Sequence, residues 1–458
     1  MSSPYIVCVD TGSTFTKAAA VSVGDDAGVL LATASVPTTV GAGQDVLTGL
    51  DQAVAQVVAT AGGSPIDIRA CSSAGGGLRL AVVGYERVVT AEAGARVGLS
   101  AGAKVVHVSS GPLDRDGIAA LKSDRPDVVL LVGGTDGGDA EVLLHNAAVL
   151  AKSGPKVPYV VAGNVDAQQD VVAIFLERKR TVVACDNVLP KIGVLNPLPA
   201  RAAIRDVFVH HVIGGKGFTK GPRFASLVRG ATPDLVLAGV ELLADSGLGD
   251  VLLVDVGGAT TDVYSALIPD ADEHPAHRDV VEIMWRGRTV EGDLGMRWSA
   301  TGVVDAALSE RLVESGDANE TLASAATARH DDPSWLPISD ADRDADTQIA
   351  RLALTVALRR HARPTESLEG RTPGRNLSDV RVVIVSGGVF RHADDDRLAA
   401  MVAPVTSDHA GGWRVPSNPR VTVDRHYVMA AAGLLGDDYP QAAQNLIRSA
   451  LVEVGVDD

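Results

Sequence analysis

One pattern occurs twice in the chain: an apolar strand ends in an aspartate, and a tight turn of small residues leads into a second apolar strand. The first copy reads YIVCVDTGSTFTKAAAVSV at residues 5–23, and the second reads DVLLVDVGGATTDVYSAL at 250–267. Short apolar runs bounded by turn residues are typical of β-strands. Because two parts of the chain begin alike, we expect two related domains that face each other.

Residues 78–190 have a different pattern, in which short, continuous apolar runs alternate with helical patterns. The apolar runs are 78–84, 105–110, 128–134, 157–163 and 181–186. This alternation is typical of a parallel, doubly wound sheet, so we predict a Rossmann-like α/β insertion in the first half. The insertion has neither an intact G-x-G-x-x-G after its first strand nor a D-x-H-x-x-G string, so we assign it no dinucleotide and no corrinoid.

The fold class is therefore α/β, and the patterns divide the 458 residues into four parts. We predict the first half of the N-terminal domain at 1–77, the inserted unit at 78–190, a helical connection at 191–249 and the C-terminal domain at 250–458. The polar and acidic stretches 269–280, 314–346 and 363–379 are expected to be surface loops, since their charge and their Pro and Gly content disfavour burial.

Composition excludes several classes of partner. The chain carries 57 acidic and 41 basic residues, a net charge of -16, and only 3% aromatic residues, which disfavours a nucleic-acid partner. No apolar run reaches the roughly 18 residues of a membrane span. Three dispersed cysteines, Cys8, Cys71 and Cys185, fit neither a disulfide framework nor a Cys₄ iron–sulfur site. We expect a cytoplasmic protein without a membrane partner.

The two Asp- and Gly-containing turns have the chemistry of a phosphate site. Each places a carboxylate, Asp10 or Asp255, at the end of a strand just before small residues. Glycine lets the backbone amides approach a phosphate closely, and Ser or Thr hydroxyls add donors without bulk. Carboxylates bind Mg²⁺, usually through water, while the ion bridges to phosphate oxygens. Two such hairpins facing each other would clamp a nucleotide, although hairpins also use Asp and Gly for purely conformational reasons.

A third glycine-containing turn, Ser386-Gly387-Gly388-Val389, follows the apolar run at 382–385. Adjacent glycines at the end of a strand would leave room for a flat ligand such as adenine or its ribose. The alternative is a simple strand-to-loop turn.

The order of these three turns resembles the PHOSPHATE 1, PHOSPHATE 2 and ADENOSINE motifs of the actin, Hsp70 and sugar-kinase superfamily. More narrowly, the chain resembles the glutamate mutase L-protein family, also called MutL or GlmL. The strings that carry this narrower likeness are SSAGGGLRLAVVG (72–84), LLVGGTDGGD (130–139), VDVGGATTDVYS (254–265) and TVEGDLGMR (289–297). The likeness covers almost the whole chain and implies two facing actin/Hsp70-like, ribonuclease H-like nucleotide-clamp domains with the Rossmann-like insertion.

The resemblance implies roles for individual residues around ATP or ADP and Mg²⁺. Asp10 and Asp255 would hold the metal, and Asp262 would coordinate it or orient water, which makes these three the expected catalytic residues. The residues expected on the phosphates are Thr11, Gly12, Ser13, Thr14, Lys17, Gly257, Gly258, Ala259, Thr260 and Thr261. Those expected beside adenosine are Ser386, Gly387, Gly388 and Val389.

The family likeness further implies an ATP-hydrolysing accessory protein, a chaperone or reactivating factor that expels a damaged cofactor from an adenosylcobalamin-dependent mutase. Two alternatives stay open: a small-molecule kinase with the same clamp, and a non-catalytic nucleotide-binding interaction protein. A kinase needs an aspartate base, for which Asp136 and Asp293 are candidates, with Glu291 beside them. Next to glycine, such aspartates are more commonly turn formers.

Overall fold

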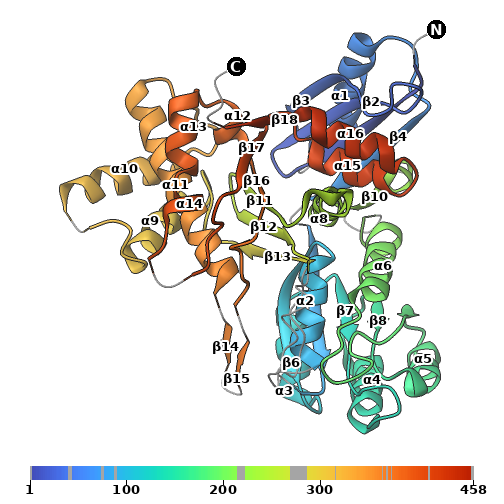
Figure 1. Ribbon diagram of the computed structural model, residues 1–458. Coiled ribbons are helices and arrows are strands. Elements are labelled where there is room, and N and C mark those ends of the chain that lie inside the picture. The colour runs from blue at the N-terminus through green and yellow to red at the C-terminus, as the bar shows by residue number, and fades with distance from the viewer. Residues whose placement is uncertain are drawn as a thin grey trace.

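The computed structural model contains three α/β regions, two of which begin with antiparallel strands, while the third is built on a wholly parallel sheet (Figure 1). The residues that the structure describes are 3–39, 44–73, 77–86, 90–213, 222–268, 286–314, 316–363, 365–367, 370–372, 374–410 and 413–454. The predicted loop 269–280 and residues 74–76 of the glycine string lie outside them.

The first sheet has the strand order β10-β4-β1-β2-β3. Its strands are β1 (Tyr5–Thr11), β2 (Phe15–Ser22), β3 (Leu30–Pro37), β4 (Asp67–Ser72) and β10 (Val228–Ala231). Strands β1, β2 and β3 are antiparallel neighbours, whereas β4 runs parallel to β1 and β10 runs parallel to β4. Helix α1 (Val46–Ala61) begins where the Asp45 carboxylate accepts the Leu47 amide hydrogen, and its apolar side is buried against this sheet.

The second sheet repeats this topology in the order β13-β12-β11-β16-β17-β18. Its strands are β11 (Val251–Val256), β12 (Thr261–Ala266), β13 (Arg286–Glu291), β16 (Val382–Ser386), β17 (Arg420–Asp424) and β18 (Leu451–Glu453). Strands β11 to β13 are antiparallel, and β16 and β17 follow in parallel. Two halves of one topology are the architecture that the repeated strand–Asp–turn pattern predicts.

Helices surround the second sheet, and two of them correct a prediction. They are α9 (Ala300–Ser309), α10 (Asp317–Asp331), α11 (Asp340–Ala362), α12 (Gly388–Arg391), α13 (Asp395–Val402) and α14 (Pro404–Ser407). The stretch 314–346 is therefore not a loop, because α10 and the first turns of α11 lie within it. Its polar and charged side chains stabilise these helices. Ser339 and Asp342 form a capping box at the start of α11, and buried Arg329 pairs with Asp346 at 2.5 Å.

The inserted unit is a five-stranded parallel sheet in the order β6-β5-β7-β8-β9, as the alternating pattern of 78–190 predicts. Its strands are β5 (Leu78–Gly84), β6 (Ala103–Ser110), β7 (Val128–Leu131), β8 (Tyr159–Val161) and β9 (Val182–Ala184). Its helices are α2 (Glu92–Ser100), α3 (Arg115–Ser123), α4 (Glu141–Ser153) and α5 (Gln168–Glu177). The unit is connected between β4 and β10 of the first sheet.

The segment 191–249 is mainly helical but is not only a connection. It contains α6 (Pro197–Val207), α7 (Arg223–Leu227) and α8 (Thr232–Leu243), and between the last two it contributes β10 to the first sheet. The four residues of β10 are too few for a strand pattern, so pairing with β4 defines them. No helix within the described ranges is both long and apolar enough to cross a membrane.

Helix α8 leads from the first sheet to the second, and α15 (Val428–Gly436) packs against α8 where the two halves meet (Figure 1). A Cβ atom at Gly433 of α15 would lie 1.9 Å from the Leu235 oxygen of α8. Glycine at this position therefore lets the two helix backbones come together. Helix α16 (Pro440–Ala450) completes the shared core.

Candidate functional site

The first turn follows β1 and carries Asp10 at its start. Asp10 accepts a hydrogen bond from the Thr232 hydroxyl at 2.6 Å, and the Cys71 thiol lies 3.6 Å from the same oxygen. Beyond it, Gly12 closes the turn by donating its amide to the Phe15 oxygen at 3.1 Å. Ser13 and Thr14 are exposed at the tip, as donors to a phosphate must be.

The second turn, between β11 and β12, is braced from behind by the segment that follows β13. The amides of Met296 and Arg297 donate to the oxygens of Gly257 and Gly258 at 2.9 and 2.8 Å, and the Ser299 hydroxyl donates to Ala259 at 2.7 Å. The VEGDLGMR string therefore holds the shape of this turn. Gly258 remains exposed at the tip.

Asp255 lies beside Asp262 across the second hairpin, and Asp255 interacts electrostatically with Lys17 of the first half. Burial raises the pKa of Asp255 to about 6, and neighbouring Asp262 also raises it, while Lys17 and a hydrogen bond from Ser386 lower it. Asp262 is held by Arg288 of β13 at 2.7 and 3.0 Å. Of the two neighbouring carboxylates, Asp262 is thus balanced by a cation of its own half and Asp255 by a cation of the other.

The third turn adjoins the second. Gly387 has φ 124°, and a Cβ atom there would lie 2.3 Å from the Val256 oxygen, so a side chain is excluded. Strand β16 pairs with β11 so that Ser386 is opposite Asp255. The ends of β11 and β16 therefore bring the predicted phosphate and adenosine turns side by side, and the predicted residue Val389 follows in α12.

Lys17 of β2 is paired with Asp10 across the first hairpin, and its Nζ lies 3.9 Å from Asp10 Oδ2. The same ammonium lies 3.6 Å from the ring centroid of Tyr427, which belongs to the second half. Burial alone would lower the pKa of Lys17, but Asp10, Tyr427, Asp255 and Asp424 together raise it. Lys17 therefore remains a cation between the two halves.

Two of the predicted threonines are fully buried. Thr11 is fully buried and its hydroxyl has no hydrogen-bond partner within the described residues, while the Thr261 hydroxyl donates to the Leu294 oxygen at 3.0 Å. The Thr261 hydroxyl is thus already engaged within the second half. Thr260 is available, with its hydroxyl 3.4 Å from Asp262.

The three candidate kinase bases fall into two places, with Asp136 in the inserted unit and Glu291 and Asp293 together at Arg360. Asp136 is in the inserted unit, where it accepts hydrogen bonds from Asn187 and from the Val165 amide, so it holds a turn. Asp293 and Glu291 both pair with Arg360 of α11 at 2.7 and 2.9 Å. Burial raises the pKa of Glu291, whereas the hydrogen bond from Arg360 lowers that of Asp293.

Sequence reasoning missed Asp424, Tyr427 and Arg288. Asp424 is 2% exposed, ends β17 and precedes α15. Its signal was available, since VTVD at 421–424 is an apolar strand ending in Asp, like the strands before the first two turns. Tyr427 and Arg288 have no local signature, because only the packing of distant strands brings them to the site.

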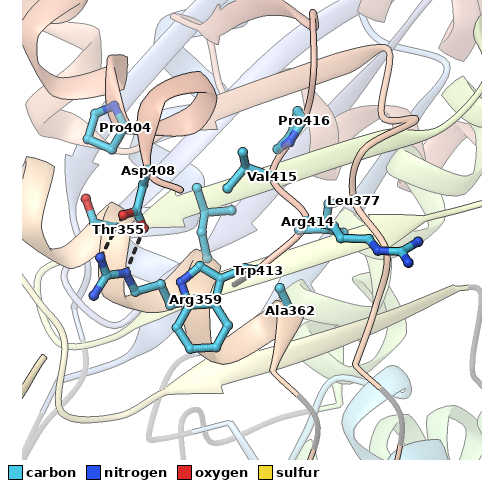
Figure 2. A pocket seen from close by; sticks show the side chains of 11 residues that line it. Thr355, Arg359, Ala362, Leu377, Pro404, Asp408, Trp413, Arg414, Val415 and Pro416 are labelled. Atoms are coloured by element: carbon cyan, nitrogen blue, oxygen red, sulfur yellow. Dashed lines mark hydrogen bonds and ion pairs between the residues drawn. The ribbon is translucent and has the colours of Figure 1, made fainter. Parts of the chain in front are cut away.

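A pocket among β1, β2, β3, α12 and α15 opens beside these residues. Among its lining side chains are Asp10, Lys17, Arg391, His426 and Tyr427. A separate pocket at the end of α11 lies over the Arg359–Asp408 ion pair, whose two hydrogen bonds measure 2.7 and 2.6 Å (Figure 2). Of the predicted site residues, Asp10 and Lys17 line the first pocket and none lines the second.

The donor set suits Mg²⁺ bound through water and phosphate. Within the described residues, no group of three or more His, Cys, Asp or Glu side chains could enclose a metal ion. Mg²⁺ normally keeps several waters and takes only one or two carboxylates alongside substrate phosphates. Asp10 and Asp255 fit that requirement.

The repeated topology, with its carboxylate-bearing turns at the junction, defines an α/β fold of two related halves with a parallel-sheet insertion in the first. The chain belongs to the MutL protein family, whose profile matches residues 6–451. It is 34% identical over 468 residues to Protein MutL of Clostridium tetanomorphum, covering 97% of this chain and 99% of that protein.

Solved structures with detectable likeness are more distant. A nucleotide-free acetone carboxylase is 15% identical, with 95% of this chain and 70% of that chain covered and a TM-score of 0.41. An ATP-dependent caprolactamase from Pseudomonas jessenii is 14% identical, with 96% and 70% covered and a TM-score of 0.37. A glycerol dehydratase reactivase is 12% identical, with 94% and 99% covered and a TM-score of 0.36. The assignment of the fold rests on strand order.

Proposed function

We propose that this protein binds ATP with Mg²⁺ between its two halves and hydrolyses it slowly. One observation carries the proposal: Asp10 and Lys17 from the first sheet and Asp255 from the second meet at the ends of matching strands. Phosphoryl transfer depends mainly on positioning and on neutralising charge, and these groups offer both.

The roles follow from chemistry and placement. The exposed Ser13 and Thr14 of the first turn and the exposed Gly258 of the second would bind the phosphates, while Gly12 keeps the first turn closed and leaves room for them. A bound Mg²⁺ would neutralise charge on the transferring group. Asp255 would accept a hydrogen bond from the attacking water, and the ammonium of Lys17 would bind terminal phosphate oxygens. Gly387 and Gly388 would border the adenosine.

We further infer that the energy of ATP serves an adenosylcobalamin-dependent mutase, with this protein as its chaperone or reactivating factor. Membership of the MutL family and the glutamate mutase L-protein strings support this role. A nucleotide held by both halves would favour their closure while the terminal phosphate is present, which supplies the differential affinity that a remodelling cycle needs.

The test combines binding with turnover. Calorimetry should detect binding of ATP with Mg²⁺, and phosphate release should be slow, faster with the mutase, and abolished in Asp10→Ala. A matched control is Asp51→Ala, which removes an exposed carboxylate paired with Arg223 on the first half. Unchanged turnover in Asp10→Ala would refute the site, and ATP consumption that requires a small acceptor would make the protein a kinase.

A further inference from the structure

The ammonium of Lys17 has two neighbours of different kinds. Asp10 is a formal anion at 3.9 Å, beyond hydrogen-bond distance, whereas the ring of Tyr427 is uncharged and closer, with its centroid 3.6 Å from Nζ. A cation over the face of an aromatic ring is attracted without using any of its N–H donors on an acceptor atom. The ring can thus hold the ammonium while its hydrogens remain available to another ligand.

The backbone fixes Tyr427 in place. Its φ is 55°, a left-handed conformation that is uncommon for a side-chain-bearing residue. Asp424, three residues earlier, accepts the amide hydrogens of Val428 and Met429 at 3.0 and 3.3 Å, which ties the start of α15 to the end of β17. Strain of this kind persists only where surrounding contacts impose it, and it is found most often at functional sites.

The ring also reaches toward the other predicted ligand groups. A Cβ atom at Gly388 would lie 3.8 Å from the Tyr427 hydroxyl, in ordinary contact. The guanidinium of Arg391 on α12 lies 5.2 Å from the same ring centroid. Tyr427 therefore extends from the lysine of the phosphate turn to the glycines expected beside adenosine, and it belongs to the opposite half from Lys17.

We propose that Tyr427 is a positioning residue whose ring, supplied by the second half, holds the ammonium of Lys17 ready for the terminal phosphate of ATP. The proposal rests on the proposed function. When Asp10 is engaged with Mg²⁺, the ring still holds the ammonium. The ring attracts this cation through its quadrupole, so it needs neither a formal charge of its own nor a hydrogen bond. Because the ring and the lysine come from different halves, this contact forms only when the halves are together.

The experiment compares Tyr427→Phe, which keeps the ring, with Tyr427→Leu, which removes it. Tyr427→Leu should lower kcat/KM for ATP with Mg²⁺ about tenfold, in line with a buried cation–π contact, while Tyr427→Phe should stay within about twofold of the wild type. Affinity measured by calorimetry should fall for a non-hydrolysable ATP analogue and change little for ADP, since only the terminal phosphate meets Lys17.

Two controls separate positioning from general damage. Tyr439→Leu removes another ring that packs against a cation at the junction, with Arg69 5.4 Å from its centroid, and should leave ATP affinity unchanged. In a Lys17→Met background, Tyr427→Leu should cause no further loss, because its partner is already gone. Equal loss of ATP and ADP affinity, or full additivity with Lys17→Met, would overturn the positioning role. If the wild type binds no nucleotide, the proposed function itself fails.

Discussion

The two hairpins share one topology but differ in charge at one matched position. Asp10 on β1 faces Lys17 on β2, whereas Asp255 on β11 faces Asp262 on β12. An opposite charge stabilises the first aspartate, and a like charge opposes ionisation of the second. The second hairpin therefore needs further cations, which Arg288 of β13 and Lys17 of the other half supply.

This difference makes the halves complementary. The first half contributes an ion pair, Lys17 with Asp10, and the second contributes two carboxylates whose charge is only partly balanced by Arg288. Bringing the halves together places Lys17 near Asp255, and this attraction offsets part of the cost of burying that carboxylate.

The largest expected effect comes from neutralising either matched aspartate. We expect Asp10→Asn and Asp255→Asn each to reduce ATP turnover by about a hundredfold or more, because each removes a negative oxygen that holds Mg²⁺ or orients water. Phosphate-release assays at saturating ATP would measure this. A variant that keeps more than a tenth of wild-type turnover would show that the two turns are not equivalent.

Breaking the pair that shields the second hairpin should cost the most stability. Arg288→Met leaves buried Asp262 without its cation and should lower the free energy of unfolding by about 3 kcal/mol. On the same strand, Arg286→Met breaks an exposed pair with Asp245 and should cost less than about 1 kcal/mol. Chemical denaturation would measure the free energy of unfolding of both variants. Equal losses in the two variants would contradict the prediction.

The burial of Asp255, together with its like-charged neighbour Asp262, also predicts a pH dependence. The pKa of Asp255 is about 6 in the folded protein, above its ordinary value, so the folded state binds the extra proton between about pH 4 and pH 6. Stability from this group is therefore present at low pH and lost as pH rises through 6. At pH 8 the free energy of unfolding of Asp255→Asn should be about 2–3 kcal/mol higher than that of the wild type. This difference should vanish at pH 4.

ATP turnover should depend on pH in the opposite direction from stability, because only the ionised form of Asp255 can take part in the reaction. The kcat/KM for ATP should fall as pH drops below about 6, in line with the pKa of Asp255 in the free protein. An acidic limb near pH 4 would instead mean that this carboxyl group is not needed in its ionised form.

The smallest effects should come from the supports behind the turns. The Thr38 hydroxyl donates to Gly12 at 2.9 Å in the first half, and the Ser299 hydroxyl donates to Ala259 in the second. Thr38→Val and Ser299→Ala should each cost about 1 kcal/mol of stability and raise KM for ATP a few-fold. Thermal unfolding and steady-state kinetics would check this. A large loss in only one of the two variants would mean that its turn depends on that single hydroxyl.

Much of this arrangement could be predicted from the sequence, for identifiable reasons. The apolar strands before Asp10 and Asp255, and the alternation over 78–190, have strong periodic signals, and the structure confirms the fold that they indicate. The five-residue strand ending at Asp424 was missed, because it follows a stretch rich in Pro, Ser and Gly. The contact of Lys17 with Tyr427 could not be predicted, since 410 positions of chain separate partners that only tertiary packing joins.

The close backbone approach at Gly433 has a consequence for how this family can vary. With the Leu235 oxygen 1.9 Å from the place of a Cβ atom, even alanine would force α8 and α15 apart. Relatives that join their halves in the same geometry must therefore retain glycine at this position. A relative with a larger residue there should have a changed angle between its two halves. The residue aligned with Gly433 therefore indicates how the halves of a relative are joined.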